Sequence, residues 1–140
     1  MTRRGERGLA TAVEAVLIIP ALALFVGLVF VLARDALAEQ GVGAAASQAA
    51  RAASLERTVS EARRSAELTA TVALREGGPG CREQSVSVDA AGLLAPIGSP
   101  ARVSVTVSCT VEHELTLPGF PRSRTITETR QSPVDTYRGR

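Results

Sequence analysis

The sequence contains no lysine, no asparagine and no tryptophan, and aromatic residues make up only 3% of it. So few aromatic side chains provide no platform for stacking nucleic-acid bases, and the apolar content of 45% comes mainly from Ala, Val and Leu. The 16 basic residues, all arginine, are nearly balanced by 14 acidic ones, so the net charge is only +2. These scarcities argue against a nucleic-acid partner, and the lack of asparagine excludes N-glycosylation.

Residues that carry metal or catalytic chemistry are equally scarce. The chain has two cysteines, Cys81 and Cys109, and one histidine, His113, which are too few for a structural zinc site. If the strand that precedes it continues, His113 points away from its neighbours Glu112 and Glu114, so no dyad forms. The sequence has no Gly-rich phosphate loop and no nucleophile elbow. We therefore predict a protein that is not an enzyme and has no metal, cofactor or small-molecule substrate.

The longest uniform feature is an uncharged apolar segment from Ala15 to Ala33, which has Pro20 near its start. A helix that rises about 1.5 Å per residue over this length roughly spans the hydrocarbon core of a bilayer. After the segment, the charges of Arg34 and Asp35 cancel. Before it, three arginines (Arg3, Arg4 and Arg7) outweigh Glu6. We therefore predict that residues 15–33 form a single transmembrane helix. The positive-inside rule predicts that its N-terminus is cytoplasmic and that the C-terminal part of the chain is exported.

Two alternatives for this segment remain open. A secretory signal would end at the small residues of Ala36-Leu37-Ala38, but the apolar segment exceeds the usual length of about 7–15 residues. A buried core helix would need a surrounding core, which so short a chain does not provide for a helix that is apolar on all sides.

The helical pattern continues over residues 34–76, which we predict to be an exposed continuation of the same helix. Small and apolar residues recur there mostly every three or four positions, at Ala45, Ala49, Ala52, Leu55, Val59, Ala62, Ala66 and Ala73. Arginine and glutamate alternate on the opposite side, as is typical of a solvated face. No Pro or Gly interrupts residues 44–76, although Gly41 and Gly43 can bend or loosen the join to the membrane helix.

Residues 77–81 (GGPGC) mark a boundary, after which the apolar residues alternate with a period of two. Val86 and Val88 begin this pattern, and residues 103–111 (VSVTVSCTV) give a clear half-buried strand. Residues 90–100 are predicted to form a loop, and residues 124–130 (RTITETR) a polar edge strand. We therefore predict an α+β fold, in which residues 82–140 form a small antiparallel sheet of about three strands that packs on the long N-terminal helix.

Cys81 and Cys109 are predicted to form an intramolecular disulfide. An exported domain meets oxidising conditions, and Cys109 shares the apolar face of its strand with the valines. The alternative is two buried free thiols.

Both ends of the chain resemble one family. The residues from Glu6 to Pro20 (ERGLATAVEAVLIIP), the VSVTVSCTV strand, the turn at residues 117–121 (LPGFP) and the ending SPVDTYR at residues 132–138 are similar to the TadE-like family of minor pseudopilins. The resemblance implies a non-enzymatic component of a tight-adherence (Flp-type) pilus or secretion apparatus, related to type IV pili. Its implied partners are the cytoplasmic membrane, a prepilin peptidase, and other pilins, pseudopilins and assembly proteins.

The same resemblance assigns roles to residues near the N-terminus. Residues 1–14 become the basic leader and processing region, with cleavage between Gly8 and Leu9, and Glu14 becomes the residue that acts in assembly within the membrane. Glu14 is the sixth residue counted from Leu9, whereas the family usually has glutamate at the fifth position. An uncleaved single-pass protein is therefore one alternative, and a membrane-tethered or secreted binding module unrelated to pili is another.

Overall fold

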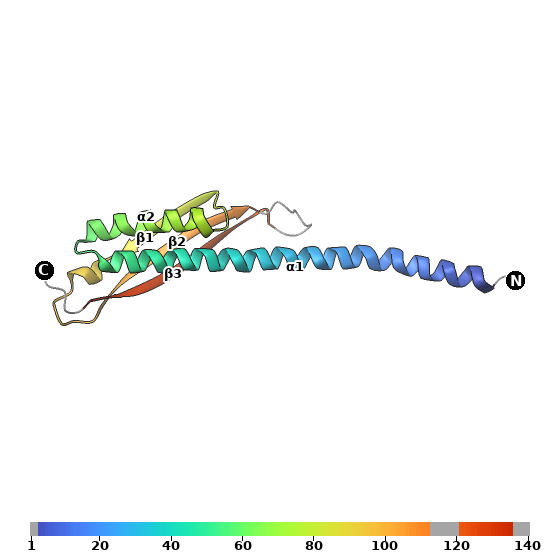
Figure 1. Cartoon of the computed structure of the whole chain (residues 1–140), viewed down its shortest axis with the longest axis horizontal. Coiled ribbons are helices and arrows are strands. Elements are labelled where there is room, and N and C mark those ends of the chain that lie inside the picture. Colours follow the sequence, from blue (N-terminus) through green and yellow to red (C-terminus); the bar gives the residue numbers. More distant parts are fainter. Residues whose placement is uncertain (1–2, 113–120, 136–140) are drawn as a thin grey trace. The chain divides into compact units, whose positions relative to one another are not determined.

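The computed structural model describes residues 3–112 and 121–135, with only the backbone described for residues 3–15. The elements are α1 (Arg3–Leu55), α2 (Val59–Gly77), β1 (Glu83–Asp89), the short 3₁₀ helix η1 (Ala91–Leu94), β2 (Ala101–Glu112) and β3 (Ser123–Val134) (Figure 1). A long apolar N-terminal helix followed by a three-stranded antiparallel sheet that packs on helices confirms the predicted α+β class. The chain divides into two compact units, Met1–Asp35 and Ala36–Arg140.

The sheet has the strand order β1-β2-β3, and both pairings are antiparallel. β1 pairs with β2 from Glu83 opposite Thr110 to Asp89 opposite Ser104. β3 pairs with β2 along its whole length, and it is an edge strand, as its polar sequence predicts. An edge position also explains how β3 continues through Pro133, since proline in sheets is confined to such places.

The prediction of one uninterrupted helix up to Glu76 was wrong. α1 ends at Leu55 and α2 begins at Val59. Thr58 has an extended backbone, and its hydroxyl oxygen accepts a hydrogen bond from the Glu61 N–H at 3.2 Å, so it caps the new helix. The same hydroxyl donates to the Glu61 carboxylate at 2.8 Å. The helix is therefore interrupted by a capped helix start, at a place where the sequence has no Pro or Gly.

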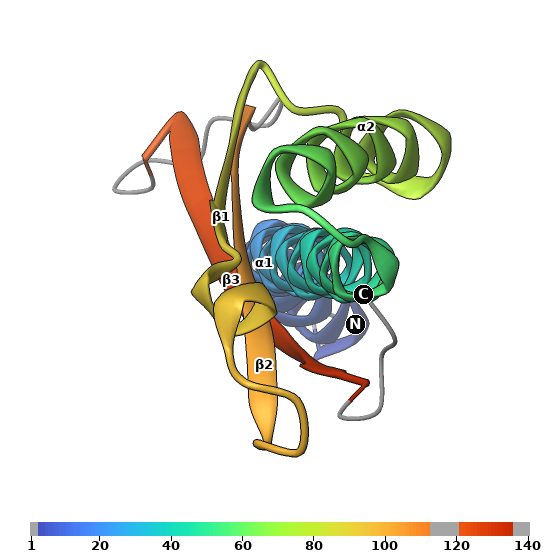
Figure 2. The same cartoon turned by 90° about the vertical axis from the view of Figure 1, so that its left-hand side faces the viewer.

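The two helices cover one side of the sheet within the unit Ala36–Arg140 (Figure 2). Residues 36–77 therefore share one core with the sheet, as expected for a sheet that packs on the helix after the membrane segment. The buried helix residues are mostly alanine, so the helices can approach the valines of β2 closely. The core consists of Ala38, Val42, Ala45, Ala46, Ala49, Ala50, Ala53, Ala62, Ala66, Ala70, Leu74, Ala90, Val103, Val105, Val107, Cys109, Val111 and Ile126.

The break between the helices also changes which small residues are buried. Four of the predicted positions are buried, namely Ala45, Ala49, Ala62 and Ala66, but Ala52, Val59 and Ala73 are only half-buried. Leu55 is 75% exposed because α1 ends there. α1 passes through Gly41 and Gly43 without interruption.

Gly78 ends α2, and its N–H donates to the Leu74 carbonyl oxygen at 3.1 Å. A Cβ atom at this position would overlap the backbone of Leu74, approaching its Cα to 2.8 Å. Only glycine therefore lets the chain turn here from α2 towards β1.

Candidate functional site

The unit Met1–Asp35 exposes an apolar surface. The exposed large side chains between Val16 and Leu32 range from 49% exposed at Val29 to 69% at Val16. Leaving so much contiguous apolar surface in water is unfavourable, and large patches of this kind mark membrane or protein contacts. This segment is therefore the first candidate functional surface.

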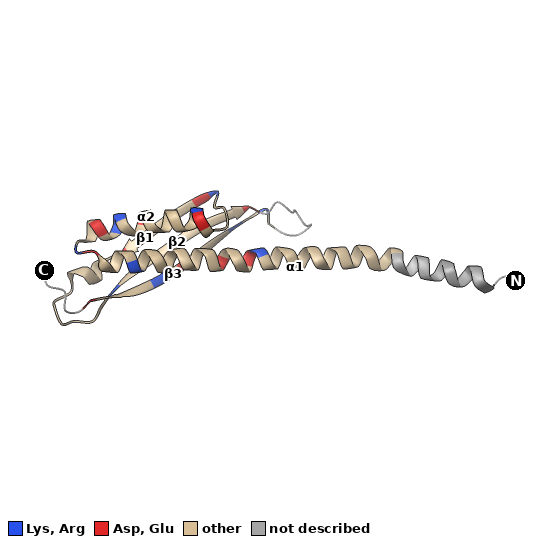
Figure 3. Cartoon of the chain, in the orientation of Figure 1, with Lys and Arg blue, Asp and Glu red and all other residues tan. Residues whose placement is uncertain are grey.

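One helix of the described residues is long and apolar enough to cross a membrane, with a mean hydropathy of 3.0 in its most apolar window. α1 carries no charged residue from Val16 to Ala33, where Figure 3 draws it without a blue or red turn. Arg34 follows immediately, and its guanidinium carbon lies 5.1 Å from the centre of the Phe30 ring. A cation beside an aromatic ring at the end of an apolar helix is typical of a membrane interface. By length and composition, this helix can serve as a membrane anchor.

The residues assigned to processing and assembly lie at the start of α1. The backbone of Gly8, Leu9 and Glu14 is helical, and their side chains lie outside the described residues. The family resemblance places cleavage between Gly8 and Leu9, where the backbone is helical, so a peptidase that takes an extended substrate would first have to unwind this part of α1. His113 and all of the predicted turn at residues 117–121 except Pro121 also lie outside the described residues.

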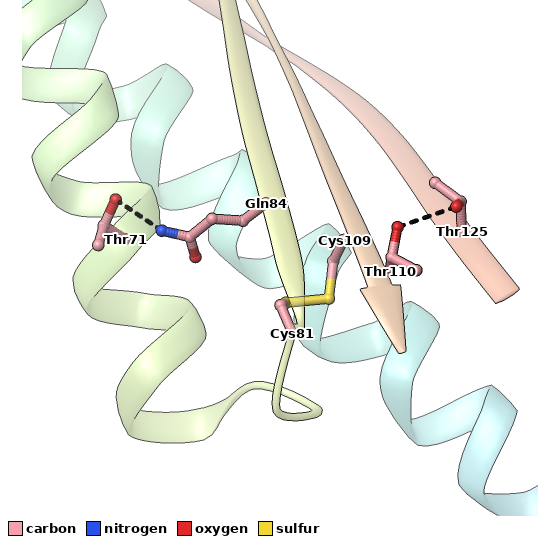
Figure 4. The surroundings of a disulfide bond; sticks show 6 residues. All are labelled: Thr71, Cys81, Gln84, Cys109, Thr110 and Thr125. Carbon is pink, nitrogen blue, oxygen red and sulfur yellow. Dashed lines mark hydrogen bonds between the residues drawn. A yellow bond between two sulfur atoms is a disulfide. The ribbon is translucent and has the colours of Figure 1, made fainter. Parts of the chain in front are cut away.

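The predicted disulfide between Cys81 and Cys109 is present, with the two Cα atoms 5.3 Å apart (Figure 4). Cys109 is fully buried in β2, and Cys81 is half-buried in the connection from α2 to β1. The free-thiol alternative is excluded, since the described chain has no free cysteine. Next to the bond, the Arg82 N–H donates to the Thr110 carbonyl at 2.9 Å and so continues the β1–β2 ladder. The disulfide therefore ties the end of α2 and the start of β1 to the central strand.

Charged side chains of β3 that face the helices form contacts that the sequence pattern does not reveal. Arg124 pairs with Glu39 of α1 at 2.7 Å, and Arg130 pairs with Glu128 at 2.7 Å. Near the end of the strand, Ser132 donates to the Ser54 hydroxyl at 3.0 Å. Such inward-facing charges protect an edge strand from pairing with other chains.

The outer face of the sheet carries rows of hydroxyl groups. Thr106 and Thr129 form a hydrogen bond of 2.8 Å across β2 and β3, and two further hydroxyl pairs follow along the strands, Ser108 with Thr127 and Thr110 with Thr125. These pairs satisfy one another, and they give the middle of this face a polar surface that water can wet.

Within the part of the chain that the structure describes, no group of three or more His, Cys, Asp or Glu residues could hold a metal ion. No family model matches the chain, and neither a curated protein nor a solved structure matches it. The resemblance to the TadE-like family therefore stays a prediction from the sequence motifs.

Proposed function

We propose that this protein is a non-enzymatic assembly component, a minor pseudopilin of a tight-adherence pilus or secretion apparatus. The observation that carries the proposal is the exposed apolar segment of α1 from Val16 to Leu32, which needs a bilayer or neighbouring apolar helices to cover it. The α+β domain that follows, together with the pilin-like motifs at both ends of the chain, supports a pseudopilin over an unrelated membrane anchor.

In this proposal the helix crosses the cytoplasmic membrane once, with the N-terminus inside. The arginines at positions 3, 4 and 7 favour this orientation, because basic residues are retained on the cytoplasmic side. The Cys81–Cys109 disulfide supports export of the domain, since disulfides persist in oxidising compartments.

The proposed route of assembly begins with a prepilin peptidase that cleaves between Gly8 and Leu9. The new N-terminal amine then pairs with Glu14 of a neighbouring subunit at the edge of the bilayer. A low dielectric strengthens this attraction and makes an unpaired carboxylate costly. Other pilins and pseudopilins supply the neighbouring helices.

The variant Glu14→Gln tests this route in cells that carry the apparatus. We expect the variant to enter the membrane normally but to be depleted from sheared pili or from the isolated base complex. Glu67→Gln, on the exposed face of α2, is the matched control and should assemble as the wild type does. Wild-type incorporation of Glu14→Gln would contradict the role of this carboxylate.

Intact mass of the wild-type protein from membranes tests the processing step. Loss of residues 1–8 is the expected result. Loss of residues 1–38 would show a cleaved secretory signal instead, and an unshortened chain would show an uncleaved single-pass protein.

A further inference from the structure

The turn between α1 and α2, η1 with the loop after it, and the end of β3 come together at one end of the unit Ala36–Arg140 (Figures 1 and 2). Residues of these segments line an open groove. Its volume is about 840 Å³, which lies within the range of small-molecule binding pockets. It is lined by Arg57, Thr58, Val59, Ser60, Arg63, Gly92, Leu93, Leu94, Ala95, Pro96, Ile97, Ser99, Ala101, Val134 and Asp135.

The apolar part of the groove includes two large side chains that are exposed to solvent. Leu94 is 72% exposed and Ile97 is 63% exposed. Leu93 and Val134 are half-buried and pack against the core, so the exposed pair lies on a supported surface. Two large aliphatic side chains on such a surface can receive a bulky apolar side chain of a partner.

The charged part of the groove is basic. Arg57 and Arg63 both line it, and neither forms an ion pair or hydrogen bond with another of the described residues. Asp135 is the one acidic residue in the described lining, so these side chains give the groove a net charge of +1. Glu61 is close to both arginines in sequence, but it does not line the groove. Its carboxylate accepts a hydrogen bond from the Thr58 hydroxyl. Two guanidinium groups that have no partner among the described residues lie beside an apolar surface, and together they complement carboxylates beside an apolar side chain.

We propose that this groove binds an acidic peptide segment of a partner protein, with a bulky apolar side chain against Leu94 and Ile97 and its carboxylates at Arg57 and Arg63. This inference goes beyond the proposed function and does not rest on it, because the groove belongs entirely to the unit Ala36–Arg140. Nucleic acid fits poorly, since no aromatic residue is among the described residues that line the groove.

Selection from a random peptide library tests the proposal without requiring that the partner be identified first. The bait is the full chain in nanodiscs with its disulfide intact, after depletion of the library on empty nanodiscs. We expect enrichment of peptides that combine several Asp or Glu residues with Leu, Ile or Phe.

A selected peptide, labelled for fluorescence anisotropy, then measures the contribution of each part of the groove. We expect R57Q/R63Q to weaken binding about tenfold, and added salt to weaken binding to the wild type. Ile97→Ser should also weaken binding, whereas Arg75→Gln, exposed on α2 outside the groove, should leave it unchanged. Circular dichroism and thiol counting confirm that each variant is folded.

Three results would overturn the proposal. These are enrichment of neutral or basic peptides, equal binding by wild type and R57Q/R63Q, and self-association of the protein that R57Q/R63Q abolishes. The last result would show that a second copy of this chain occupies the groove.

Discussion

Gly92 is a residue whose importance comes from a close backbone contact. A Cβ atom at this position would overlap the backbone of Arg102, at 2.8 Å from its carbonyl carbon and 2.9 Å from its nitrogen. Gly92 therefore allows η1 to lie directly against the start of β2, and it also lines the proposed groove.

We predict that Gly92→Ala lowers the free energy of unfolding by about 1–3 kcal/mol, as for other overpacked sites. The measurement is urea unfolding of the full chain in detergent, followed by circular dichroism. Gly77→Ala is the matched control, because a Cβ atom there meets nothing within 4 Å. Equal losses in the two variants would mean that the contact with Arg102 is unimportant.

The disulfide is the second determinant of stability at the residue scale. Cys81 and Cys109 are separated by 28 residues in sequence. Closing a loop of this length removes unfolded-state entropy worth roughly 3.5 kcal/mol in the chain-entropy model. Cys81→Ala should therefore lower the free energy of unfolding by about this amount while the buried side chain of Cys109 is retained.

Chemical reduction of the wild type is the control for this variant. The reduced protein and Cys81→Ala should have similar urea midpoints, both well below that of the oxidised protein. A midpoint that does not change on reduction would contradict a stabilising role for the bond.

At the scale of elements, the start of α2 determines how the helices fold back over the sheet. Thr58 provides the cap, and loss of a threonine cap typically costs about 1 kcal/mol. We predict that Thr58→Ala lowers the free energy of unfolding by about this amount. Thr69→Ala, in the interior of α2, should be neutral or slightly stabilising because alanine favours helix.

The start of α2 also shows that the absence of Pro and Gly does not guarantee an uninterrupted helix. Thr58 and Glu61 have the T-x-x-E spacing of a capping box, which predicts a helix start at this point. Pro and Gly are absent around this boundary, so a prediction based on these two residues alone misses it. By contrast, the alternation of valine with serine and threonine over residues 103–111 predicts both β2 and the inward orientation of Cys109 correctly, because strand periodicity is a local property.

The two candidate sites also differ in whether the sequence alone can reveal them. The apolar segment of α1 is visible in the sequence because composition alone defines it. The groove is not, because Arg57, Ile97 and Val134 are far apart in the chain and meet only after the sheet and helices have packed. The pairing of Arg124 with Glu39 depends on tertiary packing in the same way.

At the scale of the whole molecule, the two units have opposite surface chemistry. The described side chains of Met1–Asp35 are almost entirely apolar up to Ala33, whereas Ala36–Arg140 has its own alanine and valine core and a charged and hydroxylated surface. We therefore predict that deletion of residues 1–33 moves the protein from the membrane fraction to the soluble fraction. Resistance of the intact chain to alkaline extraction is the companion measurement. Extraction of the intact chain by alkali would contradict an integral anchor.

The central proposal is that one apolar helix holds a disulfide-bonded α+β domain outside the cytoplasmic membrane. Fusion of a reporter after Arg140 tests it most directly, with one reporter that is active only outside the cytoplasm and another that is active only inside. We predict activity from the exported reporter and none from the cytoplasmic one, since the arginines before the helix retain the N-terminus inside. Activity from the cytoplasmic reporter alone would show that the orientation, and with it the pseudopilin proposal, is wrong.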